Sequence, residues 1–202
     1  MAALTVTGNR AVVIGLGDIL SGDMGTACSV IEMLAQETPE EALALQYLAG
    51  DAHYVGDFIF GHTLAVVVMA VAFGGQPGKI YRWDLQAFRK NSGHFIGDND
   101  LLHRLVWSLW RTELSGHLPM GMLFLWVEPA KTEGVGLSTS GRRAARKAVQ
   151  LIKGWLSEEG VLLADAANVR AFHNFDYFSP GPNRIWCRVG LSDPPISIFE
   201  KP

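Results

Sequence analysis

The sequence has little cysteine, and the two cysteines it has cannot build a covalent or metal framework. Cys28 and Cys187 stand far apart among 202 residues, outside any CxxC or Cys/His spacing. Small secreted domains that rely on disulfides or zinc need several cysteines at short, regular spacings. The sequence therefore excludes a disulfide-rich or zinc-finger protein and favours a reducing compartment. Cys28 is predicted to be a small buried thiol in the core.

The sequence also lacks an excess of one charge and a long hydrophobic run. Its 17 Lys and Arg against 20 Asp and Glu give a formal net charge of -3, without the basic field that nucleic-acid binding requires. The longest apolar run, residues 64–73, is about half of the roughly 20 residues that cross a membrane. The N-terminal segment does not follow signal-peptide order. We therefore expect a cytoplasmic protein, with no nucleic-acid or membrane partner.

Short apolar, β-branched segments alternate with helical patterns along most of the chain. Strands are predicted at residues 10–16, 42–50, 63–73, 78–85 and 120–129, and helices at 25–37, 53–61, 97–113 and 138–160. This alternation predicts an α/β three-layer sandwich, a twisted, mostly parallel sheet with helices on both faces. We assign residues 1–160 to this domain. Residues 161–202, rich in aromatics and proline and without a helical period, are predicted to be an irregular C-terminal extension packed on it.

Two of the predicted helices carry distinctive residue patterns. In the helix at 97–113, Leu101, Leu105, Trp107 and Leu109 recur at helical intervals, after the possible caps Asp98 and Asn99. The helix at 138–160 begins with a basic cluster, which we interpret as a solvated face because such clusters are common on exposed helix surfaces. Its members are Arg142, Arg143, Arg146 and Lys147.

A glycine-rich turn, GLGDILSGDMG, follows the first strand at residues 15–25. Ligands of doubly wound folds bind at the carboxyl ends of strands, so this turn is a natural site. Gly15 and Gly17 match the first two glycines of the dinucleotide fingerprint GxGxxG, but Leu20 holds the third position and Gly22 comes too late. Without a GxxxxGK[ST] segment either, the turn is not predicted to bind a dinucleotide or cradle a phosphate.

Three segments in a fixed order suggest a different origin for the turn. GLGDILSGDMG is followed by SGHFIGDNDLL at residues 92–102 and WVEPAKTEGVGLS at 126–138. Together they resemble the segments GxGN-x-x-x-x-DE, SPHxxG and G-x-x-P-x-x-x-x-x-G-L-S/T of the hydrogenase maturation endopeptidases, over roughly residues 10–158. The resemblance implies a sheet with helices on both faces. It also implies trimming of a C-terminal peptide from the nickel-loaded large subunit of a [NiFe] hydrogenase, which would be the protein partner.

The resemblance also implies where a metal site would lie. Carried over position by position, the family's glutamate, aspartate and histidine ligands fall on Met24, Met69 and His94. Only the candidate ligand His94 keeps its type, while the two methionines are degenerate ligand positions. Thioethers are soft and neutral and suit Cu(I) or haem better than nickel or zinc. We therefore expect no metal cofactor at the family site.

A metal site formed by other residues remains a second possibility from the sequence. Asp18, Asp51 and His94 are the candidate ligands of such a site, where nickel could still bind. Asp18 can instead cap its turn, and His94 can be an ordinary loop histidine. No catalytic residue is identified, because the serines lack a GxSxG setting. The residues predicted to form the cleft are Gly15, Gly17, Asp23, Gly93, Glu128 and Pro129.

Three functions remain open from the sequence. The first is a maturation-type endopeptidase whose metal is relocated or supplied by its substrate. The second is a degenerate relative that binds a hydrogenase-like subunit as a chaperone or assembly factor without cutting it. The third is a small-molecule enzyme, because one fold hosts many functions.

Overall fold

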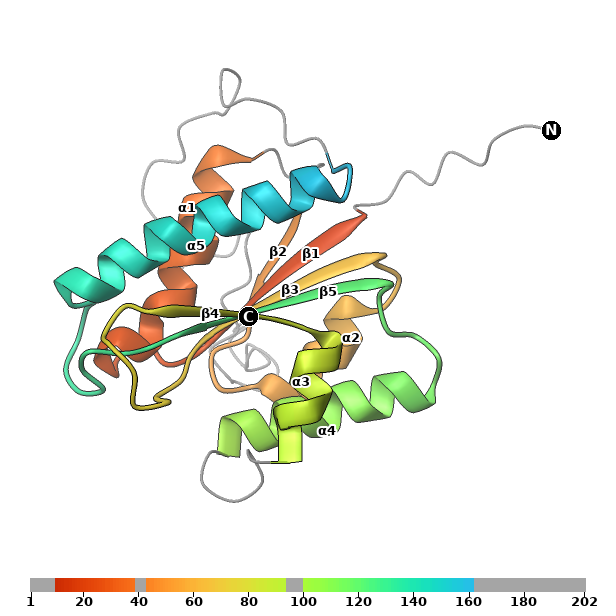
Figure 1. Cartoon of the computed structure of the whole chain (residues 1–202), viewed down its shortest axis with the longest axis horizontal. Coiled ribbons are helices and arrows are strands. Elements are labelled where there is room, and N and C mark those ends of the chain that lie inside the picture. Colours follow the sequence, from red (N-terminus) through yellow and green to blue (C-terminus); the bar gives the residue numbers. More distant parts are fainter. Residues whose placement is uncertain (1–9, 39–42, 94–99, 162–202) are drawn as a thin grey trace, which may run out of the picture.

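The computed structural model describes residues 10–38, 43–93 and 100–161. A five-stranded sheet forms its centre (Figure 1). The strands are β1 (Ala11–Leu16), β2 (Ala44–Tyr47), β3 (Leu64–Ala70), β4 (Ile80–Asp84) and β5 (Gly121–Val127). Their order across the sheet is β2-β1-β3-β5-β4, and only β4, at one edge, runs antiparallel to its neighbour.

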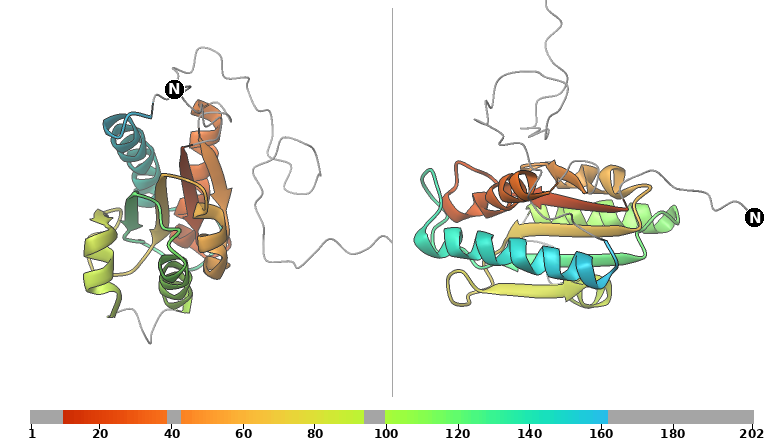
Figure 2. Two further views of the ribbon diagram at one scale, coloured as in Figure 1. Left: turned by 90° about the vertical axis from the view of Figure 1, so that its right-hand side faces the viewer. Right: turned by 90° about the horizontal axis from the view of Figure 1, so that it is seen from above.

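Helices cover both faces of this sheet (Figures 1 and 2). On one face lie α1 (Thr26–Glu37) and α5 (Thr139–Glu158), and on the other lie α2 (Val55–Ile59), α3 (Leu85–Ser92) and α4 (Asp100–Leu114). Two 3-10 turns, η1 (Gly22–Gly25) and η2 (Ala52–Tyr54), lead into α1 and α2. The predicted three-layer α/β architecture is confirmed. Among the described helices, none is long and apolar enough to cross a membrane.

The central strand β3 explains why the sheet needs helices on both faces. All seven of its residues are buried, as expected for a strand with a continuous apolar sequence. Val66 and Val68 belong to the cluster formed with α1 and α5, whereas Val67 and Met69 belong to the cluster formed with α2, α3 and α4. Successive side chains of a strand point to opposite faces, so each layer of helices receives half of β3.

Two details differ from the sequence prediction. The strand predicted through residue 85 ends at Asp84, because the Asp84 carboxylate accepts a hydrogen bond of 2.7 Å from the backbone N–H of Ala87 and so caps α3, a helix that was not predicted. In α4, Leu105 and Leu109 are buried as expected, but Trp107 is 54% exposed. Trp107 is exposed because position 107 lies on the side of α4 opposite Leu105. The possible caps Asp98 and Asn99 and the extension beyond residue 161 lie outside the described residues.

Candidate functional site

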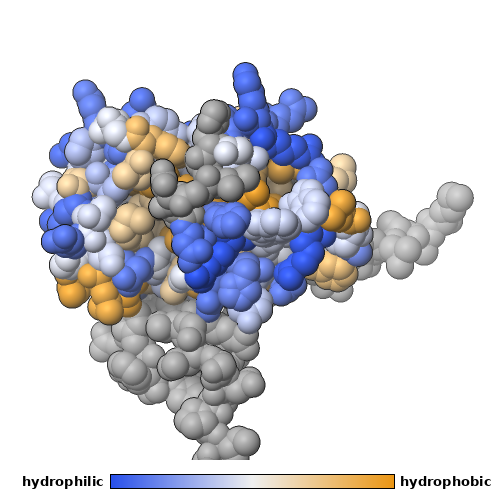
Figure 3. Space-filling model, turned by 90° about the horizontal axis from the view of Figure 1, so that it is seen from below, coloured by the Kyte–Doolittle hydropathy of each residue, from blue (hydrophilic) through white to orange (hydrophobic). Residues whose placement is uncertain are grey.

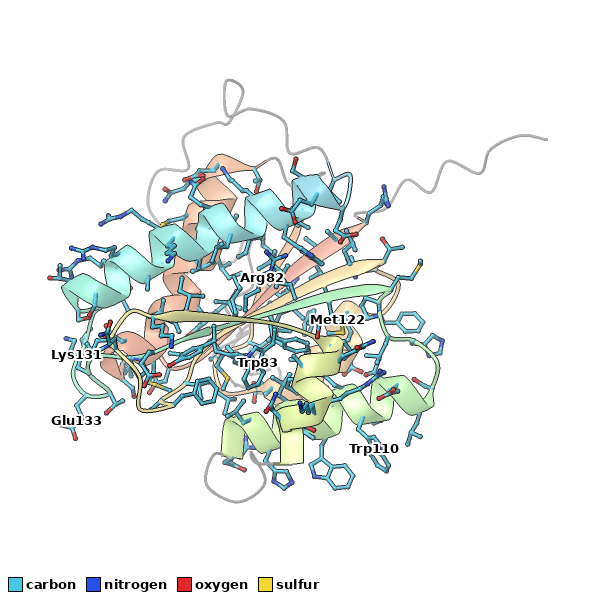
Figure 4. The ribbon with its side chains drawn as sticks, in the orientation of Figure 1. Arg82, Trp83, Trp110, Met122, Lys131 and Glu133 are labelled. Carbon is cyan, nitrogen blue, oxygen red and sulfur yellow. The ribbon has the colours of Figure 1, made fainter. Side chains whose placement is uncertain are left out.

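The candidate site lies where β1, β3 and β5 end. Leu16, Met69 and Trp126 are register neighbours across these three strands, so the loops that follow them leave the same edge of the sheet. We refer to this side as the carboxyl edge. Its loops include residues 17–25 and the loop between β5 and α5, whose Lys131 and Glu133 project beyond the sheet in Figure 4.

Gly17 gives the turn after β1 its shape. Its backbone has φ of 143°, in a region that side chains rarely adopt. A Cβ added there would lie 2.0 Å from the carbonyl oxygen of Met24. Its own N–H donates to the carbonyl of Ala49 over 2.9 Å, and its carbonyl accepts from the Tyr47 hydroxyl. The glycine therefore allows η1 to fold back against the end of β1, while Gly15 is buried beneath α1.

The first candidate ligand in this turn, Asp18, is used within the turn itself. One carboxylate oxygen accepts from the backbone N–H of Leu20 at 2.9 Å, and the other accepts from the Ser21 hydroxyl at 2.5 Å. The hydrogen bonds from Ser21 and then from Leu20 hold the pKa of Asp18 below its usual value. This arrangement is the local turn geometry that aspartate commonly adopts.

Asp23 joins two loops that are more than 100 residues apart in the sequence. Its side chain is fully buried and accepts from the backbone N–H of Ala130 at 2.8 Å, and from the N–H and hydroxyl of Ser138 at 2.6 and 2.7 Å. Its own backbone N–H donates to the carbonyl of Lys131. The buried carboxylate thus ties η1 to the loop that follows β5.

The hydrogen bonds to Asp23 determine its charge state. Burial raises the pKa of Asp23. The hydrogen bonds from Ser138, and then those from the N–H groups of Ala130 and Lys131, lower it by more than burial raises it, so the pKa lies below its usual value. Gly141 makes room for the carboxylate, because a Cβ there would lie 2.3 Å from its Oδ1. These contacts therefore stabilise the anionic form of Asp23.

Glu128 performs a similar role for the loop between β3 and β4. Its side chain is buried, and it accepts from the N–H groups of Phe73 and Gly74 at 3.1 and 3.0 Å and from the Tyr81 hydroxyl at 3.2 Å. Burial, the charge of Glu128 and this hydrogen bond raise the pKa of Tyr81. Pro129, half-buried, separates Glu128 from the Ala130 that binds Asp23. The two carboxylates thus fix the loops of the carboxyl edge.

The two methionines occupy different environments. Met69 has no exposed surface and belongs to the core cluster on the side of α2, α3 and α4, whereas Met24 is partly exposed on η1. A buried thioether between Leu16 and Trp126 has the chemistry of core packing. The pair offers a metal only soft, neutral sulfur, which does not fit nickel.

Of the remaining candidate ligands, the structure describes Asp51 but not His94. Asp51 is half-buried at the start of η2, without a side-chain hydrogen bond to that turn. Gly93 is exposed at the end of α3, and His94 lies outside the described residues. Across residues 10–38, 43–93 and 100–161, no three His, Cys, Asp or Glu side chains lie close enough to hold a metal ion.

Three residues of this edge were not predicted from the sequence. Tyr81 and Gly141 carried no recognisable signal, because a β-strand tyrosine and a helical glycine are common. Ser138 carried one: a serine directly before a helical pattern is typical of an N-cap. In the structure it caps α5 by accepting from the Gly141 N–H at 3.0 Å while also donating to Asp23.

Comparisons with known proteins place this geometry among solved structures. No family model matches the sequence, and no curated protein matches it. The structure is similar to the hydrogenase maturating endopeptidase HybD from E. coli, with a TM-score of 0.67, 18% identity, and coverage of 75% of this chain and 94% of that chain.

Two further solved structures show the same likeness. An endopeptidase from Escherichia coli has a TM-score of 0.71 and 18% identity, with coverage of 79% of this chain and 99% of that chain. The [NiFe] hydrogenase maturation protease HycI from Thermococcus kodakarensis KOD1 has a TM-score of 0.56 and 21% identity, with coverage of 75% and 95%. Over most of its length, the chain therefore has the fold of the [NiFe] hydrogenase maturation proteases.

Proposed function

We propose that this protein takes part in the C-terminal processing or assembly of a [NiFe] hydrogenase large subunit, by binding the subunit precursor at the carboxyl edge. One observation carries the proposal. Asp23 joins the first and the third of the segments on which the resemblance rests, through its hydrogen bonds to Ala130 and Ser138. Two segments that each resemble the same family are thus joined into one structural unit, in a chain that has the fold of that family.

The rim of this edge suits a peptide partner. Leu20 is 63% exposed on the glycine turn and Val135 is 77% exposed on the loop after β5. The N–H of Gly22 donates to the carbonyl of Gly134, so the two loops lie together. The hydrogen bonds of the buried Asp23 hold these loops in place. Exposed apolar side chains on such loops favour contact with a protein segment over contact with an ion.

In this proposal the protein does not bind nickel through residues 24 and 69. The thioethers of Met24 and Met69 are poor nickel ligands, and Met69 is fully buried. Any nickel belongs to the precursor as cargo. Of the two roles proposed, processing and assembly, the chemistry of these methionines favours assembly, that is, binding of the precursor without proteolysis, in the cytoplasm. The competing function is an active endopeptidase with ligands drawn from Asp18, Asp51 and His94.

The test mixes the full chain with a nickel-loaded large-subunit precursor, follows complex formation by size-exclusion chromatography, and follows precursor length by intact mass. We expect a complex and an uncut precursor. Leu20→Asp should weaken the complex, because it places a charge on the apolar rim. Met120→Asp is the matched control, because Met120 is 93% exposed directly before β5, at the opposite edge of the sheet. Cleavage at one bond would establish the endopeptidase, and absence of a complex would refute the proposal.

A further inference from the structure

The first half of helix α5 carries exposed cations and no acid. We refer to them as the cationic cluster, which consists of Arg142, Arg143, Arg146 and Lys147. Residues 134–157 include no aspartate or glutamate. Within the part of the chain that the structure describes, no ion pair involves a member of the cluster. Arg142 donates to the backbone carbonyl of Leu137 at 2.6 Å, which leaves its charge without a carboxylate.

The positions of these cations are unfavourable for the helix itself. Arg142 lies in the first turn of α5, where the positive end of the helix dipole repels cations. Arg142 and Arg146, and likewise Arg143 and Lys147, are like charges four residues apart, an arrangement that destabilises a helix. Exposed helix faces commonly alternate charges of opposite sign. A solvated face therefore explains why the cluster is exposed, but not why it contains only one sign of charge.

The neighbouring helix does not supply the missing carboxylates. Helix α1 lies beside α5 on the same face of the sheet (Figure 1). Its Glu37 is paired with Lys153, which lies further along α5. Its Glu32 accepts from the Cys28 thiol at 3.6 Å. The cationic cluster is therefore a local excess of positive charge on a chain whose formal net charge is -3.

The opposite face of the sheet is built differently. On α4, Arg104 is paired with Asp100, and Arg111 is paired with Asp57 at 3.8 Å. Hydrophilic and hydrophobic side chains are interspersed over this face in Figure 3. The arginines of α4 thus have partners within the chain, whereas those in the first half of α5 are available to a partner from outside.

The cationic cluster adjoins the carboxyl edge. Ser138, which caps α5, also donates to Asp23 beneath the loops of this edge. Lys131 adds an exposed cation, and in Figure 4 it lies near the start of α5 together with the exposed Glu133. Val135 of the apolar rim comes only a few residues before α5 and is 77% exposed. Positive charge and apolar surface therefore meet at one end of the molecule.

This combination favours a segment of protein over a nucleic acid. The cluster spans about 8 Å of the helix axis, and the chain as a whole carries a net negative charge. Nucleic acids bind through a larger basic surface that neutralises many phosphates. A short acidic segment needs only a few cations, and its apolar side chains can contact the exposed Leu20 and Val135.

We propose that the segment bound at the carboxyl edge is an acidic peptide segment of the partner protein. Its apolar side chains contact Leu20 and Val135, and its carboxylates lie beside the cationic cluster. The inference rests on the proposed function, because it names the chemistry of the precursor segment that binds there. Opposite charges placed in this way accelerate association and help to select the partner.

Two synthetic peptides test the inference against the full chain by calorimetry. They share their leucines and differ only in the residues between them, which are Glu in one and Gln in the other. We expect the Glu peptide to bind about tenfold more tightly at low salt, with a smaller ratio at high salt. Arg143→Gln combined with Lys147→Gln should weaken binding of the Glu peptide by about fivefold and leave binding of the Gln peptide unchanged.

The matched control is Arg104→Gln combined with Arg111→Gln, which removes the same charge from α4 on the other face of the sheet. It should bind the Glu peptide as the unmodified chain does. Thermal unfolding will show that each variant is folded. The unfolding temperature of the α5 variant should be unchanged or higher, because its substitutions remove repulsion between like charges.

Three results with the peptides would overturn the inference: no binding of the Glu peptide, equal affinity for both peptides, or unchanged binding of the Glu peptide by the α5 variant. A short single-stranded oligonucleotide that binds more tightly than the Glu peptide, and that the α5 variant fails to bind, would overturn it in favour of a nucleic acid.

The nickel-loaded precursor separates this inference from the proposed function. A complex with the precursor that is insensitive both to salt and to the α5 substitutions would refute only the inference. Absence of a complex would refute the proposed function, and the peptide titrations would then decide the inference by themselves.

Discussion

The carboxyl edge and the outer face of α4 are both exposed, but they are built in opposite ways. At the carboxyl edge, Asp23 and Glu128 are buried beneath the loops and hold them by hydrogen bonds. On α4, Trp107 and Trp110 are about half exposed and contact each other edge to face. We infer that changes to the buried carboxylates of the first region lower stability strongly, whereas changes to the two tryptophans of the second have a small effect on stability.

The largest effect on stability is expected for Asp23→Ala, which tests whether the buried carboxylate holds the loops of the carboxyl edge. The substitution leaves the N–H of Ala130 and the N–H and hydroxyl of Ser138 without their acceptor in a buried site. We expect it to lower the free energy of unfolding by about 4 kcal/mol, measured by urea denaturation. The control is Asp18→Ala in the exposed turn, with an expected loss of about 1 kcal/mol. Equal losses would contradict the role given to Asp23.

A smaller loss is expected for Glu128→Gln. The amide keeps the size of the carboxylate, but its NH2 group cannot accept from Phe73, Gly74 or Tyr81, so one acceptor oxygen is lost. We expect a loss of about 2 kcal/mol in urea denaturation. The exposed Glu133→Gln should change stability by less than about 0.5 kcal/mol. An unchanged free energy of unfolding for Glu128→Gln would contradict the role given to the second carboxylate oxygen.

The pH dependence of stability sharpens the role of Asp23. Its pKa is lower in the folded protein than in the unfolded chain, so the unfolded chain binds more protons in the acid range. The stability that this carboxylate contributes is therefore complete above its ordinary pKa of 3.8 and is lost as the pH falls through the folded pKa. The stability difference between the unmodified chain and Asp23→Asn should shrink on acidification. A difference that stays constant with pH would contradict this account.

The smallest effect on stability is expected at α4. Replacing Trp107 and Trp110 by alanine should lower the free energy of unfolding by about 1 kcal/mol, because the edge-to-face contact of the two half-exposed rings is lost while alanine is a good helix former. Thermal and urea unfolding of the double variant measure this. A loss as large as that of Asp23→Ala would mean that the two tryptophans belong to the folded core.

The sequence was enough to predict the layers of the fold, because strands such as β3 are continuously apolar and the helices alternate with them. It was also enough to predict a glycine-rich turn after the first strand, where Gly17 has its positive φ. The roles of Asp23 and Glu128 could not be predicted, because their hydrogen-bond partners are supplied by loops that become neighbours only when β1, β3 and β5 align. The outward position of Trp107 was missed because apolar residues at helical spacing can mark either side of a helix.

In the proposed function, residues 24 and 69 do not form a nickel site. Calorimetric titration of nickel into the full chain, beside His94→Ala and the double variant Met24→Glu, Met69→Asp, tests it most directly. We predict no nickel binding by the unmodified chain. The double variant should bind nickel, and nickel should raise its unfolding temperature, because a ligand that binds only the folded state stabilises it. Nickel binding by the unmodified chain that His94→Ala abolishes would contradict the account.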